Sequence, residues 1–387
     1  MDSASPSTAR RIIPWILAAG ACLIGTGVLM ASFAPEPLEL RQEKAEERHT
    51  VLSQVYEVDR IYRSMTGPWS LQKIRLGDPQ QDELIWITGY RAVMVGPDGE
   101  TEMPQQFMCH SNLDINVTSH QEAMGKSPGF GPRLFTLSQG QLEIDFPPGF
   151  GIPVRSKEKL DLTTQVLNLN LEGETAQVRH KVSVDFVRDQ DVGPGMKPLL
   201  PTAAYGLALL DGPDGFFGVQ NPDEHHGPGC LVEETASDHA YEDGLGRTFT
   251  GHWQVPPGRQ ENRTLVTHLM RVPYETTIHY IAVHLHPFAE SLSLRDLTTG
   301  TTLFESKARN FEDQIGLHHV DAFSSVEGIK VYPDHEYELV SLYENDSKEM
   351  QDSMAVMYLY LRDLTLEARI NDGRTDDGQS NKGRRSS

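Results

Sequence analysis

The sequence has 387 residues, and its 34 Lys and Arg against 55 Asp and Glu give a formal net charge of −21. A chain this acidic is not expected to bind nucleic acid, because neutralising phosphates needs a basic surface. Three Cys are too few for a disulfide scaffold, whereas 33 Gly and 24 Pro supply the many turns typical of all-β domains. The length allows about two folded domains.

Residues 12–34 contain no charged side chain and are long enough to cross a bilayer as a helix. Two arginines come directly before this segment, and glutamates follow it. The positive-inside rule then places residues 1–11 in the cytoplasm as a short tip and the rest of the chain outside. We therefore expect a single-pass membrane protein. A signal peptide cleaved after Ala34 is the alternative.

Residues 35–70 are expected to form a stalk and linker. Between residues 38 and 63, a charged first half is followed by apolar residues such as Val51, Leu52 and Val55. This spacing is typical of one face of a helix. The sequence therefore predicts a short stalk helix that docks on the next domain.

The pattern then changes to short alternating runs that end in Gly- and Pro-rich turns. Residues 71–235 contain such runs, for example at 141–146, and residues 248–370 contain a second series. Alternation with period two is the signature of half-buried strands. We expect two all-β domains, followed by a polar tail over residues 371–387 that is too poor in apolar residues to fold.

The second predicted domain contains a His-x-His pair in a β-prone run. On a strand, His284 and His286 project from the same face, while His279 has the opposite parity. Two imidazoles on one face can converge on one metal ion. The alternative is that the pair arose by chance, since the chain has 15 His.

A second motif, Asp352-Ser-Met354, lies at the start of a later apolar strand. The Met thioether is a soft ligand that suits copper, especially Cu(I), and imidazole suits copper too. The alternative is that Met354 and Met357 are ordinary core residues, which is the usual role of Met.

Together, His284-Leu-His286, Asp352-Ser-Met354 and the Tyr-rich strand that follows resemble the copper type II, ascorbate-dependent monooxygenases. That family includes peptidylglycine alpha-hydroxylating monooxygenase and dopamine beta-monooxygenase. The resemblance implies two tandem jelly-roll-like β-sandwich domains and a copper ion held by His284, His286 and Met354. It also implies hydroxylation of a substrate C–H bond with O₂, with ascorbate or another reductant as the electron source.

The first domain departs from the family pattern. The family carries a His-His pair and a later third His there, but this chain has Cys109-His110, and Leu167 and Asn168 stand where the third His is expected. If residues 164–170 and 177–184 form a hairpin, His180 lies on the strand beside Val166. His110, Cys109 and His180 are therefore a tentative second metal site. The alternatives for Cys109 are a buried thiol or a disulfide with Cys230.

The sequence assigns no catalytic residue beyond the metal ligands. The expected function is a membrane-anchored, exported copper monooxygenase-like protein that acts on a small-molecule or peptide substrate. The alternative is a non-enzymatic copper carrier or surface binding protein on the same scaffold, since the first-domain ligands are incomplete. A further possibility is that these His and Met residues are all structural.

Overall fold

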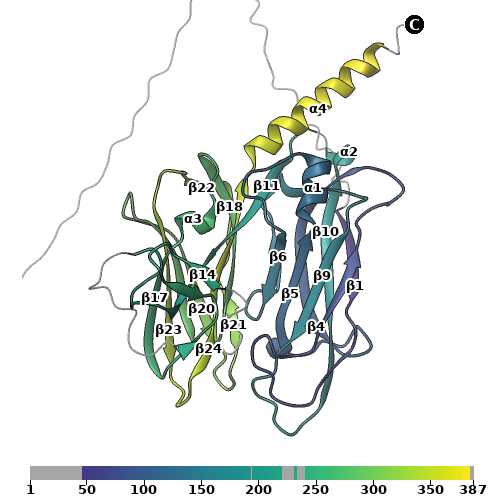
Figure 1. The fold of residues 1–387 in the computed structure, drawn as a ribbon. Helices are drawn as coiled ribbons and strands as arrows, with labels where there is room; N and C mark the ends of the chain where they lie inside the picture. Colours follow the sequence, from purple (N-terminus) through teal and green to yellow (C-terminus); the bar gives the residue numbers. More distant parts are fainter. Residues whose placement is uncertain (1–45, 193, 220–230, 233–239, 384–387) are drawn as a thin grey trace, which may run out of the picture. The chain divides into compact units, whose positions relative to one another are not determined.

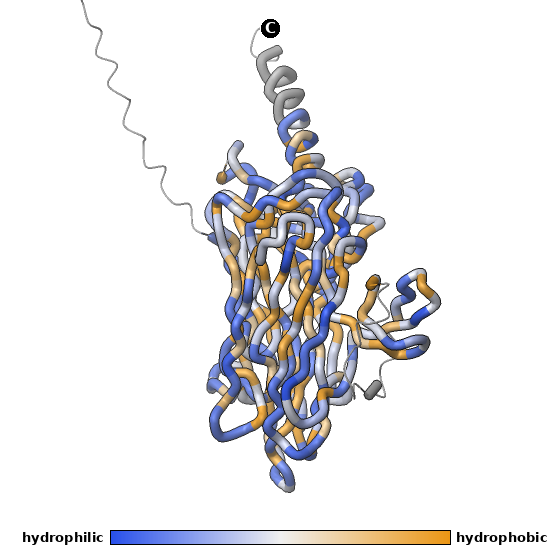
Figure 2. The backbone as a smooth tube through the Cα atoms, turned by 90° about the vertical axis from the view of Figure 1, so that its left-hand side faces the viewer, coloured by the Kyte–Doolittle hydropathy of each residue, from blue (hydrophilic) through white to orange (hydrophobic). Residues whose placement is uncertain are grey.

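The computed structural model describes residues 46–192, 194–219, 231–232 and 240–383, which belong to one compact unit, Lys44–Ser387. This unit is built almost wholly of strands, arranged as two β-sandwiches side by side (Figure 1). Polar and apolar segments alternate along the strands (Figure 2), as expected where one face of each sheet is buried. The prediction of an all-β fold of the sandwich kind is confirmed.

The first sandwich consists of two facing sheets. One sheet contains β1 (Glu47–Leu52), β2 (Tyr56–Val58), β10 (Ala176–Arg188), β4 (Leu84–Val95), β7 (Glu143–Asp145) and β8 (Phe150–Arg155). The other contains β3 (Trp69–Ile74), β9 (Leu160–Val166), β5 (Met108–Ile115) and β6 (Arg133–Ser138). Buried hydroxyls join the two sheets, as where Tyr90 Oη lies 2.7 Å from Ser111 Oγ.

The second sandwich has the same two-layer plan. One sheet contains β11 (Lys197–Tyr205), β25 (Ala355–Arg362), β18 (Thr276–Leu285) and β22 (Phe323–Val331). The other contains β17 (Gly258–Leu265), β23 (Tyr337–Asn345), β19 (Ala289–Asp296), β20 (Thr301–Asn310) and β21 (Leu317–Val320). Two small sheets flank them, formed by β12 (Ala208–Asp211), β15 (Thr248–Thr250) and β14 (Ala240–Glu242), and by β13 (Leu231–Val232), β16 (Trp253–Val255) and β24 (Gln351–Ser353).

The two sandwiches share one sheet, because β11 pairs in parallel with β8 and antiparallel with β25. The second sandwich therefore already includes residues 197–205, which the sequence had assigned to the first domain. Buried aromatic rings close the interface, with Phe146 and Tyr360 centroids 4.8 Å apart. Two hydrogen bonds cross it, from Tyr360 Oη to the Leu134 carbonyl (2.9 Å) and from the Val283 amide to Gln141 Oε1 (2.7 Å). This interface fixes how residues of the two sandwiches face each other.

Helices are few among the described residues and lie at the ends of strands: η1 (Gln105–Phe107), α1 (Val117–Met124), α2 (Asp189–Val192), α3 (Thr267–Met270) and α4 (Leu364–Gly383). α4 continues through Gly383, into the polar segment 371–387 for which the sequence predicts no fold. Its first turns are anchored, since the Arg369 guanidinium donates to the carbonyls of Met124 and Lys126.

The predicted stalk helix is wrong over its described part. Residues Glu47–Leu52 and Tyr56–Val58 are strands that pair with β10. Over so short a stretch, the spacing of the apolar residues is compatible with both a helix and a strand. Pairing with the distant strand β10 decides that the segment forms strands. In the part of the chain that the structure describes, no helix is long and apolar enough to cross a membrane. The predicted span at 12–34 lies outside the described residues.

Candidate metal centre

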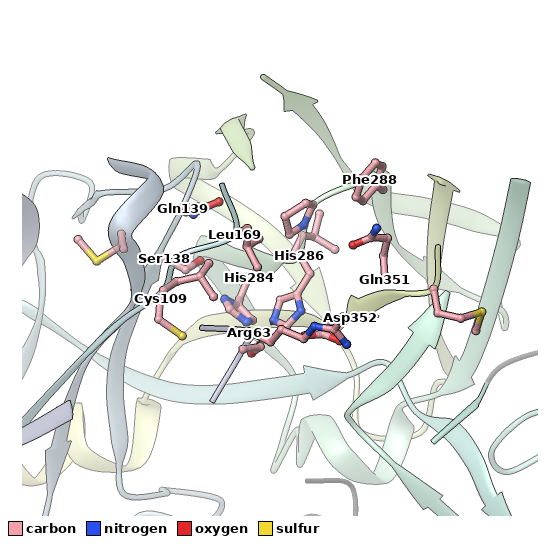
Figure 3. A pocket seen from close by; sticks show the side chains of 16 residues that line it. Arg63, Cys109, Ser138, Gln139, Leu169, His284, His286, Phe288, Gln351 and Asp352 are labelled. Carbon is pink, nitrogen blue, oxygen red and sulfur yellow. Dashed lines mark hydrogen bonds between the residues drawn. The ribbon is translucent and has the colours of Figure 1, made fainter. Parts of the chain in front are cut away.

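The His-x-His pair lies at the end of β18, where the strand reaches the interface between the sandwiches. His284 and His286 are 8% and 7% exposed, and both line a cavity of about 60 Å³. Their ring centroids are 5.3 Å apart and the rings are perpendicular. Figure 3 shows the two rings between Cys109 on one side and Asp352 on the other. The prediction that these two side chains share a face is confirmed.

Burial makes both imidazoles neutral. It lowers the pKa of His284 to about 3, with the nearby His110, His252 and Arg133 adding to the effect. Burial also lowers the pKa of His286, and Asp352 offsets only part of that shift. The Nδ1 atom of His284 is buried and has no hydrogen-bond partner among the described residues. A neutral ring with an unpartnered nitrogen is the form of His that binds a metal.

Met354 occupies the single position between β24 and β25. Its carbonyl accepts a hydrogen bond from Tyr343 Oη (2.7 Å), which fixes the backbone there. In the pairing of β18 with β25, Leu285 lies opposite Ala355, so the next position places His286 opposite Met354. The Met354 side chain lines a larger cavity of about 450 Å³ together with His284. His286 lines only the smaller cavity, whereas His284, Cys109 and Ser64 line both.

The residues present fit a soft metal ion. Two imidazoles 5.3 Å apart by centroid can share one ion at metal–nitrogen bonds of about 2.0–2.1 Å. Within the described residues, no three His, Cys, Asp or Glu side chains are grouped closely enough to hold a metal ion. The candidate set therefore depends on the Met354 thioether as its third donor, which favours copper over harder ions.

The tentative second site is not assembled as the sequence predicted. His180 lies on β10 and pairs with Met94 of β4, while β9 belongs to the facing sheet, so the predicted hairpin is wrong. The chain crosses from one sheet to the other between β9 and β10. His180 is fully buried in the first sandwich, where the edge of its ring packs near Tyr56 (centroids 5.9 Å apart). His180 lines neither cavity.

Cys109 and His110 instead face the interface between the sandwiches, where both line the larger cavity. Cys109 is a free thiol, and Cys230, its candidate disulfide partner, lies outside the described residues. Burial raises the pKa of the Cys109 thiol to about 11 and lowers the pKa of His110 to about 3. Arg133 and His180 add to the His110 shift.

His252 also belongs to this region, although no motif in the sequence marks it. This residue is buried directly before β16 and lines the larger cavity with His284 and Met354. Trp253 pairs with Ser353, so the preceding position brings His252 opposite Met354. The pairing joins segments about 100 residues apart, and nothing in the local sequence indicates it.

No protein-family model and no curated protein matches this chain. Among solved structures, the chain is similar to PNGase F, a glycosylasparaginase from Flavobacterium meningosepticum. The two sequences are 9% identical, and the match covers 82% of this chain and 97% of that one with a TM-score of 0.32. A match this distant supports no inference about function.

Proposed function

We propose that this chain is a copper-dependent, monooxygenase-like protein that hydroxylates a C–H bond of a small-molecule or peptide substrate with O₂. His284 and His286 hold the ion through neutral ring nitrogens, and Met354 is the soft third donor. The observation that carries the proposal is the cavity of about 450 Å³ that His284 and Met354 line. A substrate in that cavity lies beside the candidate ligands, which is the arrangement a hydroxylation needs.

Copper at this site would supply one-electron redox chemistry toward O₂. One oxygen atom enters the substrate C–H bond and the other leaves as water, so each turnover needs two electrons and two protons from ascorbate or another reductant. The chain's own residues position the reactants. The lining of the larger cavity includes Tyr205, Tyr241 and Tyr358, whose aromatic rings offer apolar contact to a substrate.

The uncharged segment at 12–34 and the arginines before it support an exported protein anchored in the membrane. Under this proposal, the described body is extracytoplasmic and the tip at 1–11 is cytoplasmic. A protease added to intact cells should digest a tag placed after Gly383 and spare one placed at Met1. The reverse pattern would contradict this topology.

The enzymatic proposal is tested by oxygen consumption. The full-length chain, purified in detergent, is loaded with copper, freed of excess metal and given ascorbate. We expect O₂ uptake that depends on reductant, disappears in His286→Ala and persists in His319→Ala. The control residue is a half-exposed histidine on β21 that pairs with Asp321 (3.1 Å). Bound copper without reductant-dependent uptake, with candidate substrates present, would contradict the enzymatic proposal.

One observation favours the alternative of a non-enzymatic copper carrier. The described part of the first sandwich brings no second set of three histidines together, since His180 is enclosed in the core. Without a second redox centre, the two electrons must reach one ion directly from a reductant. A carrier is expected to release Cu(I) rapidly to a soluble chelator and to consume no O₂ in the assay above.

A further inference from the structure

Cys109 belongs to the first sandwich but lies beside the histidine pair of the second. It lines the cavity of about 60 Å³ together with His284 and His286, and its side chain stands next to theirs in Figure 3. It also lines the larger cavity together with Met354. Cys109 and Ser64 are therefore the residues of the first sandwich that share a cavity with each of the three candidate ligands, and of these two only the cysteine carries a soft donor atom.

The backbone of β5 is built to turn Cys109 toward this interface. In the pairing of β5 with β9, the register shifts between Met108 and His110, which is the mark of a β-bulge. On a regular strand, Cys109 and His110 would project to opposite faces. Here both line the larger cavity. Bulges of this kind often re-aim a side chain beside a functional site.

Two further observations indicate that a ligand belongs here. His284 is more than nine-tenths buried, and its unpartnered Nδ1 lies in a ring that lines both cavities. Cys109 is a free thiol at 9% exposure. Hydrogen bonds at Val283 and Leu134 cross the interface that joins the two sandwiches.

We propose that Cys109 is a further ligand of the copper held by His284 and His286, so that the ion is bound by both sandwiches. This inference rests on the copper site of the proposed function. On binding, the thiol releases its proton to solvent and the sulfur coordinates as thiolate. Because the His and Cys donors are not already grouped at bonding distance, the Cys109 side chain moves toward the histidines as the metal enters.

The proposed ligand set has a functional consequence. Two imidazoles and a thiolate, with a more distant thioether, are the donors of copper sites that transfer electrons. A thiolate also stabilises Cu(I), the form that a carrier delivers. Coordination by Cys109 would therefore suit electron transfer or delivery of Cu(I), which supports the carrier alternative, and the O₂-uptake assay above decides between that alternative and hydroxylation.

Cobalt(II) is a suitable probe, because a thiol does not reduce it and a bound thiolate gives an intense sulfur-to-cobalt charge-transfer band in the near ultraviolet. The full-length chain is titrated with cobalt(II) and, separately, with copper(II). We expect one band of this kind per bound cobalt. It should disappear in Cys109→Ser and persist in the matched control, in which Cys22 and Cys230 are both changed to Ser. Copper affinity should fall roughly 10- to 100-fold in Cys109→Ser.

The outcomes separate the two proposals. Copper or cobalt bound with no thiolate band overturns the role of Cys109 and leaves the His284–His286 site standing. A band that survives Cys109→Ser also overturns it. No metal bound at all overturns both. If the Cys109→Ser variant does not fold, Cys109→Ala and the thiolate band of the unaltered chain show whether Cys109 coordinates the metal.

Discussion

His180 in the first sandwich and His284 in the second are both buried histidines, but of these two only His284 lines the cavities at the interface. Both are buried, burial lowers the pKa of each to about 3, and each has at least one ring nitrogen without a hydrogen-bond partner among the described residues. His180 is enclosed between two sheets, with Tyr56 at its edge, whereas His284 lines two cavities. Burial thus makes a histidine neutral, but only an adjoining cavity gives it something to bind.

The largest change in copper affinity is expected when one histidine of the His284–His286 pair is replaced. We expect His284→Ala and His286→Ala each to weaken copper binding by at least about 100-fold, because each removes one of two nitrogen donors. Equilibrium dialysis against a competing chelator measures the affinity. His319→Ala should bind as tightly as the unaltered chain. Equal affinity in all three variants would place the copper elsewhere.

Acid should destabilise the metal-free protein. The pKa values of His180 and His284 are lowered from 6.5 to about 3, so the unfolded chain binds more protons below pH 6.5. Stability is therefore full above pH 6.5 and is lost as the pH falls toward 3. Urea unfolding at pH 7, 6 and 5 should show a midpoint that falls steadily. A midpoint that rises on acidification would contradict the assignment of these rings as buried and neutral.

Met354→Leu should have a smaller and more selective effect. Leucine keeps the apolar volume, so the fold should be unchanged, but the soft sulfur donor is removed. We expect roughly tenfold weaker binding of Cu(I) and little change for Cu(II), measured with chelators specific for each oxidation state. Met357→Leu, on the neighbouring buried strand, is the matched control and should change neither affinity.

The smallest effect is expected at His180. His180→Leu replaces a buried polar ring, whose nitrogens have no hydrogen-bond partner among the described residues, with an apolar side chain of similar volume but different shape. The gain from removing an unpaired polar group and the cost of packing a differently shaped side chain should leave the free energy of unfolding within about 1 kcal/mol of the original. Copper binding should not change. A loss of copper binding in this variant would mean that His180 is a copper ligand, and it would contradict the difference drawn here between His180 and His284.

The sequence was most informative where the relevant contacts are local. Strand alternation alone placed His284 and His286 on one face, because that depends only on period two. The all-β class followed from turn composition in the same way.

The sequence was least informative where pairing joins distant segments. The position of His252 opposite Met354 depends on the pairing of β16 with β24, and the interface position of Cys109 depends on a bulge in β5. The strand at Glu47–Leu52 exists because β10 pairs with it. None of these contacts can be predicted from the residues that are neighbours in the sequence.

We propose that the histidine pair of the second sandwich holds one copper ion and that the core histidine of the first sandwich, His180, holds none. The most direct test is the copper content of the full-length chain after equilibration with excess metal and removal of loosely bound ions with a chelator. We expect one copper per chain. Two ions per chain would mean that the first sandwich has a site of its own, and no retained copper would contradict the proposed metal centre.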